Sequence, residues 1–399
     1  MQQFLDELIA SGTFGTLPRE VVYLLGMLAA GFLVAFVFVL NIAGGTTFIE
    51  RRIWARIHDR VGPNRVGPQG ILQWLVDGIK LLMKEDVVPA QADPILFRLA
   101  PYVVMVGFLT TFVVIPFSSV LVIADMNVGI LFLTAVTSLV VVGILMAGWS
   151  SNNKWSLIGG IRAAAQIVSY EIPAAISIIT IVLVTGTLSM QEIIRQQGWA
   201  PTDWLLFHSP FTFAAFFVLL TSLLAEGNRT PFDLPEAESE LVAGFVTEYS
   251  GVRYLIFFMA EWGNLYVIGA VMTTLFLGGW QIPPVTDSAV LQGFLEFLTF
   301  FTKSYFWVLV AIWVRATLPR VRVDQLMTVC WKYLVPISFV NLLGTAVWVV
   351  VWPEGNRIAE IALFALAVLL VLQFFRRVAF HLRRARVRER GELYLSPLA

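Results

Sequence analysis

The sequence predicts an all-α polytopic membrane protein, and three observations support this prediction. Hydrophobic residues make up 58% of the 399 positions, charged residues make up only 14%, and the mean hydropathy is +0.79. Soluble domains carry more charge than this. Several uncharged runs, among them 21–49, 99–124 and 126–153, exceed the roughly 20 residues that a helix needs to cross a bilayer. The first run is too long for a cleaved signal peptide, so we expect it to remain as a helix.

The apolar runs predict a single transmembrane domain over residues 1–399. We expect about nine spanning helices, of which the first is long and tilted. The predicted spans are 21–49, 99–122, 128–149, 163–188, 210–226, 252–280, 291–314, 333–352 and 358–376.

The distribution of Lys and Arg predicts the orientation of the chain. Residues 51–98 contain eight of these basic residues and the tail from Arg376 contains seven arginines, whereas the alternate loops hold only Arg195 and Arg357. Basic loops face the cytoplasm. We therefore expect the N-terminus outside and the C-terminus in the cytoplasm, which agrees with an odd number of helices.

The first cytoplasmic loop, 51–98, is long and has two parts. A turn-rich piece, GPNRVGP at 62–68, is followed by residues 71–84, whose apolar side chains recur at helical spacing around Asp77, Lys80 and Lys84. This second part is too short and too polar to cross a membrane, so we interpret it as an amphipathic helix at the membrane surface. It is either a plain surface anchor or one wall of a cavity that lipids can reach.

A second cytoplasmic loop, 227–251, is acidic. Together with the residue before it, this loop carries six carboxylates and few bases. The carboxylates are Glu226, Asp233, Glu236, Glu238, Glu240 and Glu248, and the base that lies between them in the sequence is Arg229. The simplest interpretation is a solvated loop. However, Pro231 and Pro235 restrict its backbone, and Glu236 and Glu240 share one face if this part is helical. A folded, carboxylate-lined segment beside a membrane suggests the handling of protons or cations.

Three apolar spans are each interrupted by a charged residue: Glu171, Glu261 and Lys303. A charge facing lipid is costly, so these side chains should face the protein interior or one another. They form either structural ion pairs or a channel. Glu171 and Glu261 each lie about 8 residues, or roughly 12 Å, from the predicted cytoplasmic ends of their helices. Since Glu226 ends its helix on the same side, we expect one polar channel that opens towards the cytoplasm, with Pro173 loosening the backbone there.

The sequence offers no redox centre of its own. Cys330 is the sole cysteine, and the three histidines lie outside the apolar runs. Internal disulfides and cysteine-ligated iron–sulfur clusters are therefore excluded, and a bis-histidine haem is not expected. The net charge is zero, so nothing points to nucleic acid. Any electron transfer should occur in a partner protein.

Motifs along residues 20–350 resemble one known family, the H-type membrane subunits of respiratory complex I (NADH:quinone oxidoreductase) and their mitochondrial counterpart. NRTPFDL at 228–234 followed by ESELV at 238–242 is a very specific pattern. The other matching motifs are Glu50-Arg51-Arg52, GPNRVGP at 62–68, Lys84-Glu85, Ser169-Tyr170-Glu171, Met259-Ala260-Glu261 and RVRVDQLM at 320–327. Two features depart from the family pattern: Arg52 stands where Lys is common, and the ninth helix with its basic tail, 358–399, exceeds the eight helices of mitochondrial members.

The resemblance implies a role for each of two groups of residues. A quinone tunnel, which is the path of the substrate, would be lined by Glu50, Arg51, Arg52, Arg60 and Asp77. A proton channel and its acidic loop would comprise Glu171, Glu226, Asp233, Glu236, Glu238, Glu240, Glu248, Glu261 and Lys303. The chain would bind no metal or iron–sulfur cluster and would not be catalytic alone.

The resemblance also implies partners and a location. The partners would be the peripheral subunits that carry the terminal iron–sulfur cluster and the small and antiporter-like membrane subunits. The location would be the bacterial cell membrane. Two other functions remain open from the residues themselves: the membrane anchor of a related membrane-bound hydrogenase, and an independent cation transporter. The complete NRTPFDL and ESELV pattern favours the quinone enzyme, and the absence of visible inverted repeats argues against the transporter.

Overall fold

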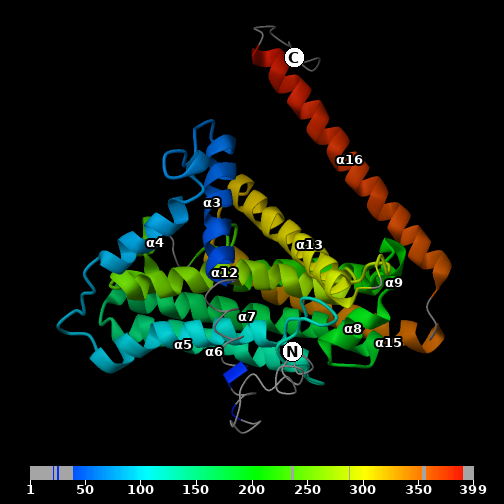
Figure 1. Ribbon diagram of the computed structural model, residues 1–399, viewed down its shortest axis with the longest axis horizontal. Helices are drawn as coiled ribbons and strands as arrows, with labels where there is room; N and C mark the ends of the chain where they lie inside the picture. The colour runs from blue at the N-terminus through cyan, green and yellow to red at the C-terminus, as the bar shows by residue number, and fades with distance from the viewer. Residues whose placement is uncertain are drawn as a thin grey trace.

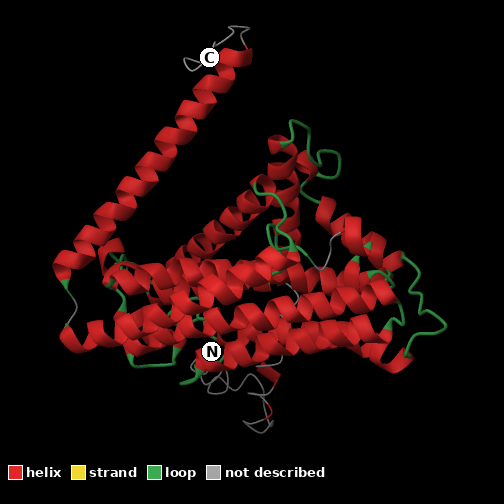
Figure 2. Cartoon of the chain, turned by 180° about the vertical axis from the view of Figure 1, so that it is seen from behind, coloured by secondary structure: helices red, strands yellow, loops and turns green. Residues whose placement is uncertain are grey.

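The computed structural model describes residues 39–234, 238–286, 288–352 and 356–389, together with three isolated positions between 21 and 26. In this part of the chain every regular element is a helix and no strand occurs, as Figure 2 shows. The predicted all-α fold class is therefore confirmed.

Six helical segments are long and apolar enough to cross a membrane within the described residues. They are α5 (Pro94–Val114), α6 (Gly129–Ser150), α7 (Lys154–Thr185), α12 (Gly251–Phe276), most of α13 (Ala289–Thr317), and the continuous stretch of α14 (Val323–Thr328), a π-helical segment (Val329–Leu334) and α15 (Val335–Val351). The apolar helix α10 (Pro210–Glu226) is shorter than these. Membrane crossing by nine helices stays a prediction.

Several predicted boundaries are wrong. α7 begins at Lys154 instead of 163, so Glu171 lies 17 positions into its helix, whereas Glu261 lies 10 positions into α12. The expected equal depth of about 8 residues is therefore incorrect. The early start of α7 has a packing reason: a Cβ on Gly159 would lie 2.6 Å from the Cα of Gly244, and Ser156 donates a hydrogen bond to the Gly244 carbonyl.

Helices α5, α6, α7 and α12 run side by side and form the body of the molecule, whereas α3 (Leu40–Ile57) stands across them and α13 slants away (Figure 1). Small residues allow the close contacts. A Cβ on Gly148 of α6 would lie 3.1 Å from the Cα of Gly160 of α7, so only glycine permits this approach of the two backbones. Of the first predicted span, residues 22–24 and 27–38 lie outside the described part, and α3 continues eight residues beyond Ile49.

The helix starts follow from local sequence. Asp93 caps α5 by accepting hydrogen bonds from the backbone N–H groups of Ile95 and Leu96, and Asn153 caps α7 in the same way. Ser209 and Thr212 form a reciprocal capping box at the start of α10. The amphipathic helix expected at 71–84 is present as α4 (Gln73–Met83), and none of its residues is fully buried.

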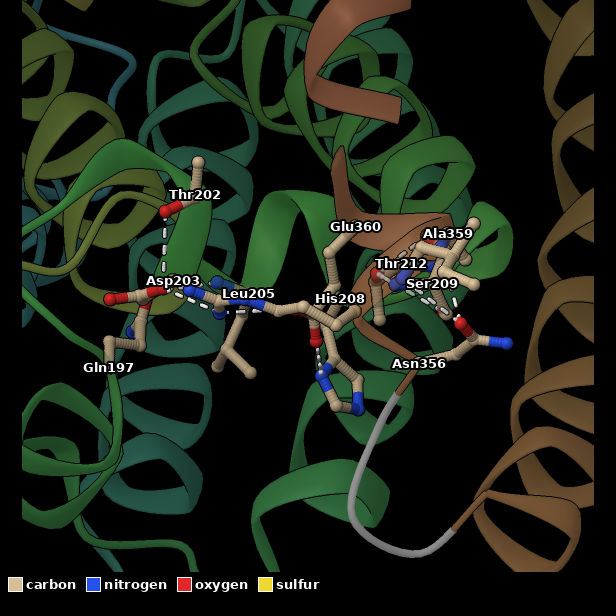
Figure 3. Close-up of polar contacts among 12 residues, drawn as sticks. Gln197, Thr202, Asp203, Leu205, His208, Ser209, Thr212, Asn356, Ala359 and Glu360 are labelled. Atoms are coloured by element: carbon tan, nitrogen blue, oxygen red, sulfur yellow. Dashed lines mark hydrogen bonds and ion pairs between the residues drawn. The ribbon is translucent and has the colours of Figure 1, made fainter. Parts of the chain in front are cut away.

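The final helix, α16 (Arg357–Glu389), contacts the body near its first turns and then extends away from it (Figure 1). Polar contacts hold the docked end against the short helix α9 (Leu205–His208) and the segment before it, as Figure 3 shows. Arg357 pairs with Asp203 at 2.9 Å, and Glu360 lies 3.6 Å from His208. The Phe207 and Phe364 rings add an edge-to-face contact at 5.3 Å.

Candidate functional site

A cavity of about 730 Å³ lies among α6, α7, α12, the end of α10 and the segment that follows α10. Its lining includes three of the carboxylates that the sequence singled out, Glu171, Glu226 and Glu261, together with Arg229 and Arg315. The predicted gathering of these three carboxylates is thus found. Some lining side chains, such as Leu131 (58% exposed) and Val168 (50% exposed), are open to the surroundings, so the cavity reaches the protein surface.

Glu171 and Glu226 face this cavity without a basic partner. Ser138 of α6 donates a hydrogen bond to Glu171 at 2.6 Å. Glu226 is the last residue of α10, and its Oε1 is buried without a hydrogen-bond partner in the described part of the chain. No Lys or Arg among the described residues pairs with either carboxylate. A buried carboxyl oxygen without a hydrogen-bond partner is energetically costly, and this applies to Glu226.

Glu261 is different because it meets a buried arginine. The Arg229 guanidinium lies 3.0 Å from Glu261 and 4.3 Å from the centre of the Trp262 ring, and only 2% of the Arg229 side chain is exposed. Nε and Nη1 of Arg229 are buried with no hydrogen bond in the described region. Glu261 and the Trp262 face are therefore the main electrostatic stabilisation of this cation.

A second ion pair continues from the first. Arg315, near the end of α13, donates a hydrogen bond to Glu50 of α3 at 2.8 Å. Its guanidinium lies 5.7 Å from the Trp262 ring and 5.4 Å from the Trp54 ring. Trp262 is thus shared by Arg229 and Arg315. The two pairs form a charge-balanced cluster that joins α3 to the wall of the cavity.

The next residues of α3 lead to the first cytoplasmic loop. Arg51 forms an ion pair with Asp77 of α4, and Gln73 also donates a hydrogen bond to Asp77 at 3.0 Å. Arg52 donates to the backbone carbonyl of Gln69 at 2.8 Å. Arg51 and Asp77 are therefore in contact, whereas Glu50 and Arg52 flank Arg51 in α3 and bind other partners, and Arg60 is exposed beyond the end of α3.

The acidic segment is folded onto its neighbours. Gln166 of α7 donates hydrogen bonds to the Ala225 and Phe232 carbonyls at 2.8 and 2.7 Å, which fixes the start of the segment. The carboxylates of this segment bind groups outside the cavity: Asp233 pairs with Arg320 at 3.1 Å, Glu240 with Arg162 at 2.6 Å, and Glu248 accepts from Asn153 at 2.6 Å.

The end of the acidic segment is anchored by Tyr249. Its ring stacks on Phe97 at 4.1 Å, and its hydroxyl donates to the Phe97 carbonyl at 3.2 Å. Burial raises the pKa of Tyr249 to about 12. Tyr249 therefore stays protonated near neutral pH and acts as a structural anchor.

Comparison with known protein sequences shows the family to which this chain belongs. Residues 30–346 match the family model described as NADH dehydrogenase. The H subunit of NADH-quinone oxidoreductase from Anaeromyxobacter dehalogenans is 53% identical over 322 residues, which cover 77% of this chain and 78% of that protein. The chain belongs to this family. The H subunit of Chlorobium luteolum is 47% identical (76% of this chain, 84% of that protein), and one H subunit of Geobacter sulfurreducens is 44% identical (82% and 95%).

As a member of the NADH dehydrogenase family, the protein is a membrane subunit of an NADH-quinone oxidoreductase, and it is not catalytic alone. Its partners are other subunits of that complex. The names of the relatives favour this function over a hydrogenase anchor or an independent cation transporter. Among the described residues, no group of three or more His, Cys, Asp or Glu side chains is placed to hold a metal ion.

Several predicted site residues of this family member lie away from the cavity. Lys303 donates to the Leu277 and Gly279 carbonyls at 2.9 and 3.1 Å, so it caps the far end of α12 and does not join Glu261. Glu236 and the side chain of Glu238 lie outside the described residues. The roles of these residues, and of Asp233, Glu240 and Glu248, stay predictions.

Sequence reasoning missed two site residues and one buried carboxylate. The sequence pattern singles out neither Arg229 nor Arg315 as a site residue, although Arg229 pairs with the partly buried Glu261 and Arg315 pairs with the buried Glu50. Glu296 of α13 was overlooked; it is 5% exposed and accepts hydrogen bonds from the backbone N–H and hydroxyl of Ser119. A signal was available for Glu296, because it interrupts an apolar span as Glu171 does.

Proposed function

We propose that this chain forms the membrane part of the quinone tunnel along α3 and α4, and that its carboxylate cavity couples quinone reduction to proton movement. One observation carries the proposal. The cavity that contains Glu171 and Glu226 reaches Arg315, and Arg315 is paired with Glu50, the residue next to the Arg51–Asp77 pair. Charged residues thus continue from the proposed quinone side to the proposed proton side.

The coupling follows from competition between charges. A quinone that gains negative charge near Arg51 would compete with Asp77 for the guanidinium, and the same field would act on the neighbouring Glu50–Arg315 pair. Because Arg315 and Arg229 both face Trp262, a shift of one arginine changes the surroundings of the other. Glu261 would then bind its arginine less or more tightly, and the uncompensated Glu226 and Glu171 would take up or release a proton.

The acidic segment is the element that we propose to move. Val242 has a φ of 64°, a left-handed conformation that is strained for a β-branched residue, and Val242 lines the cavity. A strained residue in the cavity wall supports the proposal that this segment has a second conformation.

We propose that the peripheral iron–sulfur subunits dock on the basic first loop and that the small and antiporter-like membrane subunits receive the protons. We also propose that the N-terminus lies outside and the C-terminus in the cytoplasm.

The test of the tunnel uses Arg51→Ala in the assembled complex, with Arg56→Ala as the control. Arg56 is also exposed on α3, and it lies more than one turn further along. Arg51→Ala should raise the KM for quinone by about tenfold, the usual effect of a lost charged contact, while NADH oxidation by an artificial acceptor is unchanged. Equal losses in both assays, or an equal effect of Arg56→Ala, would contradict the tunnel assignment.

A further inference from the structure

Helix α4 is held against α3 by an unusually close contact. The indole of Trp74 lies on the backbone of α3 at Gly44, so that a Cβ built on Gly44 would be 2.5 Å from Cδ2 of the ring and closer still to Cε3. Those separations are far inside van der Waals contact, and the ring would have to leave. Among the described residues, no atom lies within 4 Å of a Cβ added to the neighbouring Gly45. Only one of the two adjacent glycines is therefore required for this contact.

α4 also packs against α12. None of its residues is fully buried, however, and Leu75, Val76 and Ile79 are 43, 40 and 45% exposed. Its polar attachment is the Arg51–Asp77 pair, which lies one turn along α4 from Trp74 and two turns along α3 from Gly44. The spacing between α3 and α4 (Figure 1) is thus set at two points: an aromatic ring seated on glycine and an ion pair.

We infer that Trp74, seated on Gly44, determines which quinone tails pass between α3 and α4. This inference rests on the tunnel proposed above and adds a specificity-determining pair to it. An isoprenoid tail is long and apolar, and it gains affinity from each apolar wall that it contacts. Trp74 supplies a flat apolar wall, and its seat on Gly44 fixes the width of the passage. The headgroup depends on the charged residues instead, so tail and headgroup recognition are separable.

The test compares Gly44→Ala with Gly45→Ala in the assembled complex, reconstituted into vesicles. One quinone carries a tail of many isoprenoid units and the other carries a single unit. Gly44→Ala displaces the ring and should raise the KM for the long-tailed quinone by about tenfold, the size of effect that one methyl group has in an apolar site. The KM for the short-tailed quinone and kcat for both should change less than twofold, and Gly45→Ala should resemble the parent.

A double-mutant cycle separates this role from a structural one. Trp74→Val removes the indole wall and should raise the KM for the long-tailed quinone about as much as Gly44→Ala does, and adding Gly44→Ala to Trp74→Val should change that KM less than twofold further, because no ring remains to be displaced. NADH oxidation by an artificial acceptor reports assembly in each variant. The inference is overturned if Gly44→Ala raises both quinone KM values equally, if Gly45→Ala has the same effect, or if the effects of Gly44→Ala and Trp74→Val multiply in the double variant.

Failure of the inference is distinguishable from failure of the tunnel. If Arg51→Ala selectively raises the quinone KM whereas Gly44→Ala does not, the tunnel stands and the Trp74 wall is wrong. If neither variant changes the KM for either quinone, the α3–α4 tunnel itself is wrong.

Discussion

Two pairs of carboxylates near the cavity differ in what faces them. Glu50 and Glu261 each meet an arginine, at 2.8 and 3.0 Å. Glu171 meets a serine hydroxyl, and Glu226 has no basic partner among the described residues. A buried ion pair leaves an uncompensated charge when one partner is removed, which costs about 3–5 kcal/mol. A carboxyl group that can be neutral leaves no such charge. Glu50 and Glu261 should therefore stabilise the structure, whereas Glu171 and Glu226 should carry protons.

The largest expected effect is the loss of the Arg229 cation. Arg229→Leu leaves Glu261, whose side chain is only 24% exposed, without its counter-charge, so the complex should fail to assemble or should melt at a much lower temperature. Arg162→Leu is the matched control, because its pair with Glu240 is exposed and should contribute at most about 1 kcal/mol. Yield and melting temperature of the purified complex give the result. Equal stability of the two variants would remove the distinction between paired and unpaired carboxylates.

The next effect concerns an unpaired carboxylate. Glu171→Gln keeps the hydrogen bond to Ser138 within reach but abolishes titration, so assembly should be normal and proton pumping should fall at least about tenfold. Glu296→Gln is the control, because Glu296 is a buried carboxylate that lies outside the cavity. Pumping per NADH oxidised in sealed vesicles is the measurement. A pumping Glu171→Gln enzyme would show that a carboxylate in the cavity is dispensable.

A moderate effect is expected in the acidic segment. Val242→Gly removes the strain of a φ of 64°, which is worth about 1–3 kcal/mol, and should hold the segment in the described conformation. Backbone hydrogen exchange across 238–250 should slow and turnover should fall. Ala243→Gly, at a φ of −137°, relieves no such strain and should speed exchange. If Val242→Gly exchanges as fast as Ala243→Gly, the segment stores no strain that matters for movement.

The smallest expected effect concerns a third case, the carboxylate of Glu360, whose partner His208 can itself gain or lose a proton. Burial lowers the pKa of His208, and this outweighs the opposite influence of Glu360. Arg357, which pairs with Asp203 and Glu360, is the other charge at this site. With its folded pKa below the ordinary value of about 6.5, His208 contributes stability that is present above pH 6.5 and is lost as the pH falls below it.

Hydrogen exchange of residues 357–367, corrected for intrinsic rates, should therefore increase from pH 7.5 to pH 5.5. In His208→Gln the same pH change should have little effect beyond the intrinsic one. Identical pH profiles in the two proteins would mean that His208 does not control the docking of α16.

The helices and the gathering of carboxylates were predictable, because both follow from local hydropathy and from the cost of a charge in an apolar span. The partners were not. Arg315 lies 265 positions from Glu50 in the sequence, and Arg229 is the single base of an acidic loop, where nothing in the sequence shows which carboxylate it meets. Lys303 gives a different lesson: a charge in an apolar span predicts a channel residue, whereas this ammonium binds two backbone carbonyls at a helix end, and its channel role stays a prediction. Sequence patterns locate buried charges, whereas only the fold decides what neutralises them.

Paired and unpaired carboxylates should have different roles, and the direct test compares Glu226→Gln with Glu261→Gln. Both substitutions remove one titratable group from the same cavity. Glu226→Gln should assemble fully, with the melting temperature of the parent, and should pump at least about tenfold less per NADH. Glu261→Gln should assemble less completely and melt at a lower temperature than Glu226→Gln, because Arg229 remains buried without its counter-charge. If the two variants show the same stability and the same pumping, pairing with Arg229 does not divide the carboxylates, and the proposed difference in their roles is wrong.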